Sequence, residues 1–172
     1  MASPEIIRQS LERAVETVAL KPTRGLRTYS NVATIVEGTR CRVIEQHDEL
    51  LVDIPRSVGG ESEGPSPSMI LRSAISSCVA IGIKQWAARQ SVPIARVDVT
   101  LETDVDARGQ LGVSDEIAPG FLGLRLAISV VTAADPADVK DIVRRSLKYS
   151  PLMDVLQRAQ AVETRIELLQ EA

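Results

Sequence analysis

The chain has 172 residues, a formal net charge of −3 and a sequence pI near 5.3. Its length fits one domain of ordinary size, and 44% apolar with 25% charged residues is typical of a globular protein. The acidic balance argues against nucleic-acid and anionic-membrane partners, and 2% aromatic residues offer little for stacking bases. We therefore expect a core built from Val, Ile, Leu and Ala.

The N-terminus and the cysteines indicate a cytoplasmic protein. Residues 1–8 lack the apolar core of a signal peptide, and no apolar run approaches the length of a membrane span. Two cysteines, Cys41 and Cys78, do not make a disulfide framework, so each thiol stays available for chemistry in a reducing compartment. His47 is the only histidine. We expect it in a solvated turn, and we expect no metal site.

The first third of the chain predicts a helix followed by a strand meander. Ser3 and Pro4 form an N-cap and N1 pair, apolar residues follow at helical spacing, and the helix ends before Lys21. β-like stretches then follow at residues 29–37, 40–45 and 49–54, with a turn at His47-Asp48. Residues 55–67, rich in Gly, Ser and Pro, predict a loop within the domain.

A long helix is predicted from Pro67 to about Arg89, after a cap at Ser66. Its apolar positions cover more than a single stripe, which indicates burial on several sides, in the middle of the domain or between subunits. Gly82, one turn after Cys78, costs about 1 kcal/mol of helix propensity relative to Ala. We expect another backbone to approach closely there.

The second half alternates strands and helices. Apolar and polar residues alternate with a period of about two residues along two stretches, and Pro follows a capping residue at two helix starts. The predicted elements are strands at 97–105 and 122–130, helices at 136–148 and 151–159, and a last strand at 162–168. This order indicates an α+β fold of mainly antiparallel sheet packed on helices, in a single domain 1–172.

Four segments together resemble the OsmC/Ohr family of small thiol-dependent hydroperoxide reductases. They are Gly38-Thr-Arg40, the run from Pro55 to Gly60, Gly64-Pro-Ser-Pro leading into the Cys78 helix, and Lys148-Tyr-Ser150-Pro151. The last resembles the place where the family carries Cys-Pro at the start of a helix. The resemblance leaves the first helix outside, so we divide the domain into an extra N-terminal helix, 1–21, and a family core, 22–172.

The resemblance implies a fold, a partner and a chemistry. The fold would be OsmC-like, with antiparallel sheets around a long buried central helix, in an intertwined homodimer with the thiol site at the subunit interface. Cys78 matches the reactive thiol, which attacks the O–O bond of an organic hydroperoxide and becomes a sulfenic acid. Arg40 matches the arginine that stabilises the thiolate, as a nearby cation does. No cofactor is implied beyond an external thiol or dithiol reductant.

The chain departs from the family pattern at two positions. About ten residues before the thiol the family often has a Glu that orients the arginine, whereas Ser68 and its neighbours offer no carboxylate. Ser150 replaces the second, resolving cysteine and cannot form an intramolecular disulfide. Cys41 is a poor substitute, because neighbouring residues on a strand point to opposite faces. If Arg40 faces Cys78, Cys41 does not, and we expect it in the strand core.

Two functions remain open at this point. In the first, the protein is a peroxiredoxin-like organic hydroperoxide reductase in oxidative-stress defence, with Cys78 as its single catalytic cysteine and Arg40 as its activator. Apolar neighbours of Cys78, such as Ile75 and Val79, favour an organic peroxide. In the second, the protein is an inactive homologue that binds an apolar small ligand or has a structural role, because free cysteines are most often buried core residues.

Overall fold

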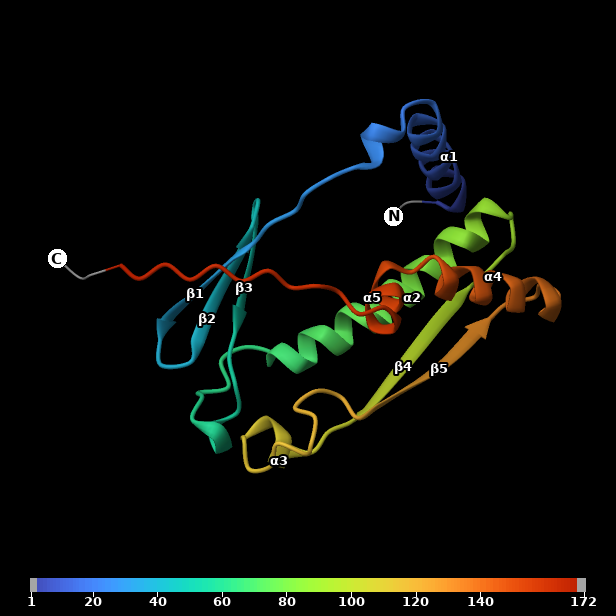
Figure 1. The fold of residues 1–172 in the computed structure, drawn as a ribbon. Helices are drawn as coiled ribbons and strands as arrows, with labels where there is room; N and C mark the ends of the chain where they lie inside the picture. The colour runs from blue at the N-terminus through green and yellow to red at the C-terminus, as the bar shows by residue number, and fades with distance from the viewer. Residues whose placement is uncertain (1–2, 170–172) are drawn as a thin grey trace.

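The computed structural model describes residues 3–169 and has a mixed α+β fold organised around one long helix (Figure 1). This helix, α2 (Pro67–Arg89), runs through the middle of the molecule. It contacts α1 (Pro4–Leu20), β4 (Arg96–Asp104), α4 (Pro136–Lys148) and α5 (Pro151–Gln157). None of the helices among the described residues is long and apolar enough to cross a membrane.

The four longer helices begin where the caps predicted them. Each has Pro at its start and a preceding side chain that accepts a hydrogen bond from a backbone N–H of the first turn. The capping residues are Ser3, Ser66, Asp135 and Ser150. Because these caps satisfy amides that the helix itself leaves unpaired, short local motifs are enough to fix the helix starts.

The strands form two antiparallel sheets. The strands β1 (Val32–Glu37), β2 (Arg40–Glu45) and β3 (Asp48–Val52) make a three-stranded sheet in that order. The strand β4 pairs with β5 (Gly123–Val131) as a long hairpin. Short turns of helix lie between these elements at η1 (Pro22–Gly25), η2 (Arg56–Val58) and α3 (Ala107–Gln110). The turn between β2 and β3 is at Gln46-His47, one residue earlier than predicted.

The hydrophobic core lies where α2, α4 and the hairpin β4–β5 meet. Its buried members are aliphatic, as the composition predicted: Val79, Ile83, Ala87, Ile94 and Ile142. The inward residues of β4 and β5 pack against this cluster, while their neighbours along each strand face solvent. The alternation of apolar and polar residues along β4 and β5 is therefore that of a hairpin with one face covered by the core.

Gly82 has a close neighbour, as predicted, but the close atom belongs to a side chain and not to another backbone. A Cβ at this position would lie 2.5 Å from Ser146 Oγ on α4 and 3.9 Å from Ser146 Cα. Ser146 is buried and donates its hydroxyl to the backbone oxygen of Val79 at 3.1 Å. The absence of a side chain at Gly82 is what lets α4 pack this closely on α2.

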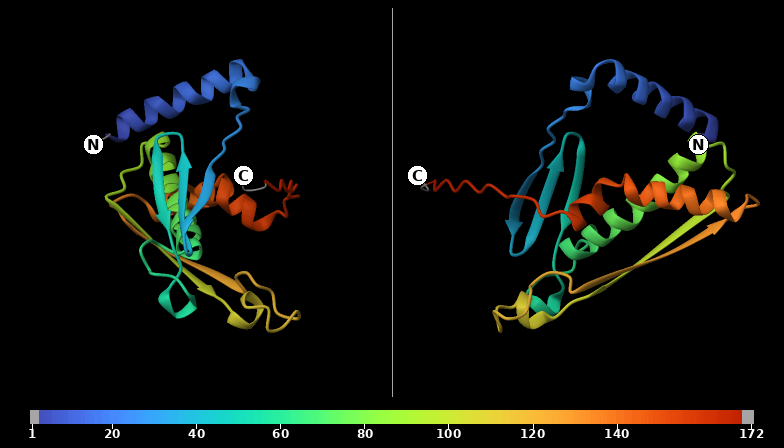
Figure 2. Two further views of the ribbon diagram at one scale, coloured as in Figure 1. Left: turned by 90° about the vertical axis from the view of Figure 1, so that its left-hand side faces the viewer. Right: turned by 45° about the vertical axis from the view of Figure 1, so that its right-hand side comes forward.

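The predicted last strand, 162–168, is wrong for the single chain. Residues 158–169 form no regular secondary structure and extend away from the body, as Figure 2 shows. Their alternating apolar side chains are almost fully exposed, with Val162 at 84%, Ile166 at 81% and Leu168 at 90%. Strand propensity needs a neighbouring strand edge to become a strand, and no described segment pairs with these residues.

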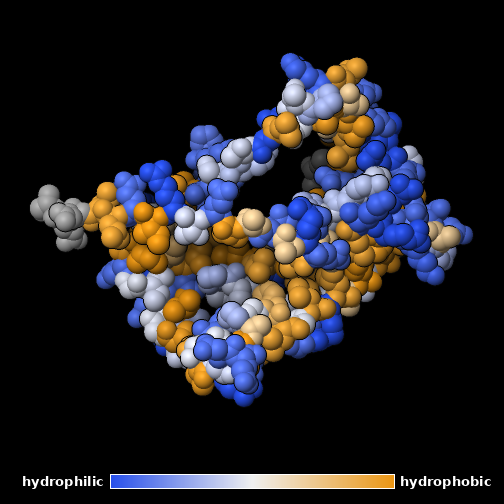
Figure 3. Space-filling model, viewed as in Figure 1, coloured by the Kyte–Doolittle hydropathy of each residue, from blue (hydrophilic) through white to orange (hydrophobic). Residues whose placement is uncertain are grey.

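Burial of α2 on several sides is also incomplete in one chain. Ile75 is 1% exposed, but Leu71 and Ile81 are 43% and 57% exposed. The sheet β1–β3 is more open still, since every residue of β1 is exposed. Figure 3 shows the resulting apolar surface, which is visible across the middle of the molecule and along the C-terminal segment.

Candidate functional site

Cys78 and Ser150 are brought together by the packing of α5 on α2. Cys78 is half-buried in the middle of α2, and its Sγ lies 3.3 Å from Ser150 Oγ. Ser150 is 5% exposed and forms the N-cap of α5. The residue that stands at the matched position of the second cysteine is therefore in contact with the candidate nucleophile.

The hydroxyl hydrogen of Ser150 is available to Cys78. The backbone N–H of Met153 donates to Ser150 Oγ at 3.3 Å, so the helix cap uses the oxygen only as an acceptor. A serine hydroxyl has one hydrogen and two lone pairs. Ser150 can therefore cap α5 and donate to the sulfur at the same time.

Arg40 is held by two carboxylates at the start of β2. Its guanidinium donates to Glu63 at 2.8 Å and also pairs with Glu37. The hydrogen bond to Glu63 and the charges of both carboxylates raise the pKa of Arg40 above its usual value, so the side chain remains a cation. Sequence reasoning sought the orienting carboxylate near Ser68 and missed Glu63, which lies in the preceding loop.

Asp53 is a second residue that sequence reasoning missed. Its side chain is 1% exposed and accepts from the hydroxyl of Thr39 at 2.7 Å. It also accepts from the backbone N–H groups of Ile54, Glu61 and Glu63 at 2.8, 2.9 and 3.2 Å. These hydrogen bonds, first that of Thr39, lower the pKa of Asp53 to about 2. The carboxylate thereby ties the turn before Arg40 to the loop that carries Glu63.

Gly60 and Gly64, which lie in two of the segments that resemble the OsmC/Ohr family, let this loop fold back on the end of β3. A Cβ on Gly60 would lie 1.9 Å from the backbone oxygen of Ile54. One on Gly64 would lie 2.3 Å from the backbone oxygen of Leu51. No other residue fits at such distances, so the glycines serve the geometry around Asp53 and Arg40.

Arg40 and Cys78, the two residues predicted to form the site, make no polar contact with each other within residues 3–169 of the single chain. The polar contacts of Arg40 within residues 3–169 go to Glu37 and Glu63, and that of Cys78 goes to Ser150. Cys41, also half-buried, lies opposite Val52 in the sheet, and both cysteines are free. The roles of Cys78 as nucleophile and of Arg40 as its activator therefore stay predictions.

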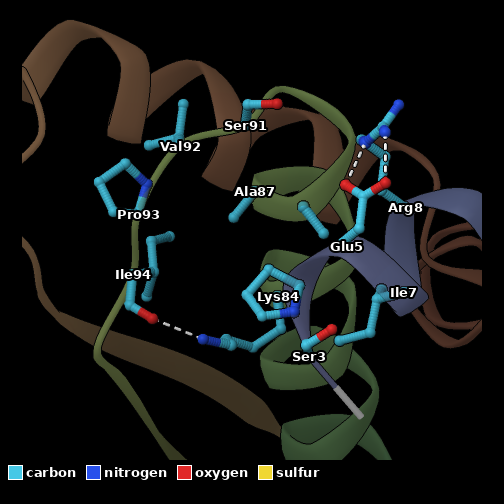
Figure 4. A pocket seen from close by; sticks show the side chains of 12 residues that line it. Ser3, Glu5, Ile7, Arg8, Lys84, Ala87, Ser91, Val92, Pro93 and Ile94 are labelled. Carbon is cyan, nitrogen blue, oxygen red and sulfur yellow. Dashed lines mark hydrogen bonds and ion pairs between the residues drawn. The ribbon is translucent and has the colours of Figure 1, made fainter.

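The described part of the chain offers no metal site, and one of its cavities lies away from Cys78. Within residues 3–169, no three His, Cys, Asp or Glu side chains are close enough together to hold a metal ion. A cavity of about 420 Å³ lies between the start of α1 and the end of α2 (Figure 4). Neither Cys78 nor Arg40 lines it.

Comparison with known proteins gives one family and one fold. The family model described as OsmC-like protein matches residues 59–165. No curated protein matches the chain. A crystal structure of an OsmC-like protein from Mycoplasma pneumoniae superposes with a TM-score of 0.65 at 15% identity, covering 76% of this chain and 88% of that one.

Two further similar structures are organic hydroperoxide resistance proteins by description. The protein from Elizabethkingia anophelis has a TM-score of 0.57 at 17% identity over 77% of this chain and 89% of its own. The OsmC protein from Legionella pneumophila has a TM-score of 0.52 at 18% identity over 77% of this chain and 92% of its own. At such identities the likeness shows the fold.

Proposed function

This chain belongs to the OsmC-like protein family, and from that premise we propose that it reduces organic hydroperoxides as a one-cysteine thiol peroxidase. The observation that carries the proposal is the contact between Cys78 and Ser150, in which a half-buried thiol lies 3.3 Å from a buried hydroxyl. The descriptions of the Legionella and Elizabethkingia proteins support the choice of substrate class. We place the reaction in the cytoplasm, where thiols stay reduced.

The proposed cycle needs only the peroxide and an external thiol. The Cys78 thiolate attacks the terminal, hydroxyl-bearing oxygen of the peroxide, so an S–O bond forms and the O–O bond breaks. The leaving alkoxide takes a proton from solvent to become an alcohol. Cys78 is then a sulfenic acid. One external thiol displaces water from it to give a mixed disulfide, and a second thiol releases Cys78 together with an external disulfide.

In the proposed cycle, Ser150 donates a hydrogen bond to Cys78 when the thiol is ionised. A thiolate carries no hydrogen, so in that state the hydroxyl must be the donor across the 3.3 Å contact. Hydrogen bonds to an ionised acceptor are roughly twice as strong as neutral ones. The same residue explains why the cycle needs an outside thiol, because a serine cannot resolve the sulfenic acid.

A second copy of the chain completes the proposed assembly. The exposed apolar residues of β1, the unpaired C-terminal segment and the exposed side of α2 support a homodimer that covers all three. The separation of Arg40 from Cys78 within one chain is consistent with a site shared between subunits. In that dimer, Arg40, oriented by Glu63, would be the cation that favours the Cys78 thiolate.

Peroxide consumption with cysteine variants tests the proposal. We expect the wild type to consume cumene hydroperoxide with a small dithiol as reductant, Cys78→Ser to lose at least 100-fold of that rate, and Cys41→Ser to keep it. Ser150→Ala should slow the reaction, while Ser150→Cys should form an intramolecular disulfide with Cys78 after one equivalent of peroxide. No consumption by the wild type, or equal loss in both cysteine variants, would contradict the proposal.

One observation favours the second candidate, an inactive homologue that binds a small apolar ligand. Within residues 3–169 the polar partners of the Arg40 guanidinium are Glu37 and Glu63, and it makes no polar contact with Cys78. Alkylation distinguishes the two functions. An inactive protein should show Cys78 reacting with iodoacetamide no faster than Cys41 at pH 7, whereas a peroxidase requires a distinctly faster Cys78.

A further inference from the structure

One wall of the cavity under α1 comes from an element that the family model does not include. The match covers residues 59–165, whereas one wall of the cavity is the first two turns of α1. The opposite wall is the last two turns of α2 and residues 91–94 after it. Lys84, at its base, follows Cys78 by six residues, about 9 Å along the helix axis. The cavity is therefore a separate site from the thiol.

The walls of this cavity are mainly apolar. Ile7 projects from α1, and Ala87 and Ala88, at 2% and 6% exposed, form the back. Val92 and Ile94 close the side away from α1 (Figure 4). A volume of about 420 Å³ lies within the range of about 300–1,000 Å³ usual for small-molecule sites.

One cation in the cavity lacks a charged partner. Lys84 is half-buried, and its Nζ donates to the backbone oxygen of Ile94 at 2.5 Å. An ammonium has three N–H donors, so two remain for a ligand. The other charged residues at the cavity, Glu5 and Arg8, pair with each other at 2.7 Å, and within residues 3–169 no carboxylate lies within 4.0 Å of Lys84 Nζ.

From this arrangement we propose that the cavity binds a small amphipathic anion, a carboxylate on a short apolar chain. The carboxylate accepts hydrogen bonds from Lys84 Nζ, and the chain lies against Ile7, Ala87 and Val92. A half-buried cation favours an anion over a neutral ligand, because the ligand supplies the counter-charge that the protein omits. The Glu5 carboxylate is paired with Arg8 at 2.7 Å, which offsets part of its charge, because Arg8 also pairs with Glu12 at 2.8 Å.

Binding of octanoate to the full-length protein tests this proposal, with 1-octanol as the neutral probe of the same chain length. We expect saturable binding of octanoate by calorimetry, and perturbed amide resonances in residues 84–94 and in the first turns of α1. Octanol should bind at least tenfold more weakly. Equal affinities for the two probes, or perturbations centred on Cys78 and Ser150, would overturn the proposal.

Matched variants separate the charge from the packing. Lys84→Met keeps an unbranched apolar stem without the charge and should weaken octanoate at least tenfold while leaving octanol unchanged. Lys140→Met, at an exposed position on α4, should leave both affinities unchanged. Ile7→Glu places a negative charge in the wall and should also weaken octanoate. Unchanged octanoate binding in folded Lys84→Met would refute the role of the ammonium.

The site does not depend on the proposed peroxidase activity. Cys78→Ser should bind octanoate with wild-type affinity, because no atom of Cys78 lines the cavity. A protein without peroxidase activity that still binds octanoate through Lys84 would therefore uphold this inference. An active peroxidase that does not bind octanoate would overturn it and leave the proposed function intact.

Discussion

Cys78 and Arg40 lie in two halves of the molecule that are stabilised by different interactions. The helical half, formed by α2, α4, α5, β4 and β5, buries Val79, Ile83 and Ile142 completely. The sheet half, formed by β1–β3 and the loop 53–66, buries little apart from Val52 and Asp53. It is held by the backbone pairing of its strands and by the hydrogen bonds of Asp53 to Thr39 and to the loop. The helical half therefore contains the buried core, although one side of α2 remains exposed, whereas the sheet half has hydrogen bonds and a largely exposed apolar surface.

The largest loss of stability is expected when a buried side chain of the helical half is shortened. Ile142→Ala removes a side chain that is 0% exposed, and we expect a loss of about 2–5 kcal/mol of unfolding free energy. The matched change in the sheet half, Ile35→Ala at 62% exposed, should cost less than about 0.5 kcal/mol for a single chain. Urea unfolding measures both. Equal losses at low protein concentration would contradict the division into two halves.

The contact between α2 and α4 predicts that Gly82→Ala destabilises the wild type but stabilises a variant without the Ser146 hydroxyl. Gly82→Ala forces Ser146 Oγ away from Val79 O, and leaving that buried hydroxyl unpaired costs about 1–3 kcal/mol. In a Ser146→Ala background the clash is gone, so the same change should stabilise by up to about 1 kcal/mol through helix propensity. Chemical unfolding of the four proteins completes the cycle. Destabilisation by Gly82→Ala in both backgrounds would show that Ser146 is not the obstacle.

The lowered pKa of Asp53 predicts that the protein loses stability at low pH. The hydrogen bond of Thr39, with those of three backbone amides, lowers the folded pKa of Asp53 to about 2, against about 3.9 in an unfolded chain. The unfolded state therefore binds the proton more readily, and the stabilisation is complete above about pH 4 and lost as the pH falls from about 4 to about 2.

The test of this pH dependence is the variant Asp53→Asn. We expect its unfolding free energy to fall less steeply below pH 4 than that of the wild type, and its loop to release Glu63 and Arg40. Asp98→Asn, at an exposed position on β4, provides the control and should keep the wild-type slope. Identical slopes in wild type and Asp53→Asn would show that Asp53 does not hold this part of the chain.

The smallest effect on a single chain is expected at the surface of β1, where the effect on association is large. Ile35→Asp should change the stability of the isolated chain by no more than about 0.5 kcal/mol. In the homodimer that we propose, however, a buried charge there should convert dimer to monomer in sedimentation experiments. Ile6→Asp, 53% exposed on α1, should leave the assembly unchanged. A wild-type protein that is monomeric at micromolar concentration would exclude this role for β1.

Local sequence determined where the regular elements begin and which residue types fill the core. Ser or Asp followed by Pro placed all four longer helices, because capping depends on a few adjacent residues. The alternation along β4 and β5 predicted their covered faces. Gly82 predicted a close approach, although the close atom is the side-chain hydroxyl of Ser146 and not the predicted backbone. The four segments that resemble the OsmC/Ohr family predicted the fold, because they combine glycines that the loop geometry requires with the long apolar helix.

Tertiary structure decided which residues meet. The hydroxyl of Ser150 touches the sulfur of Cys78 only because α5 folds back on α2, and Arg40 finds its carboxylate in Glu63 only because Asp53 draws the loop toward Thr39. The residues 162–168 carry the alternation of a strand, yet they remain unpaired because a strand needs a neighbouring strand, which no segment within residues 3–169 provides. Periodicity and caps act over a few residues and can be read along the chain, whereas partners in space depend on how the whole chain packs.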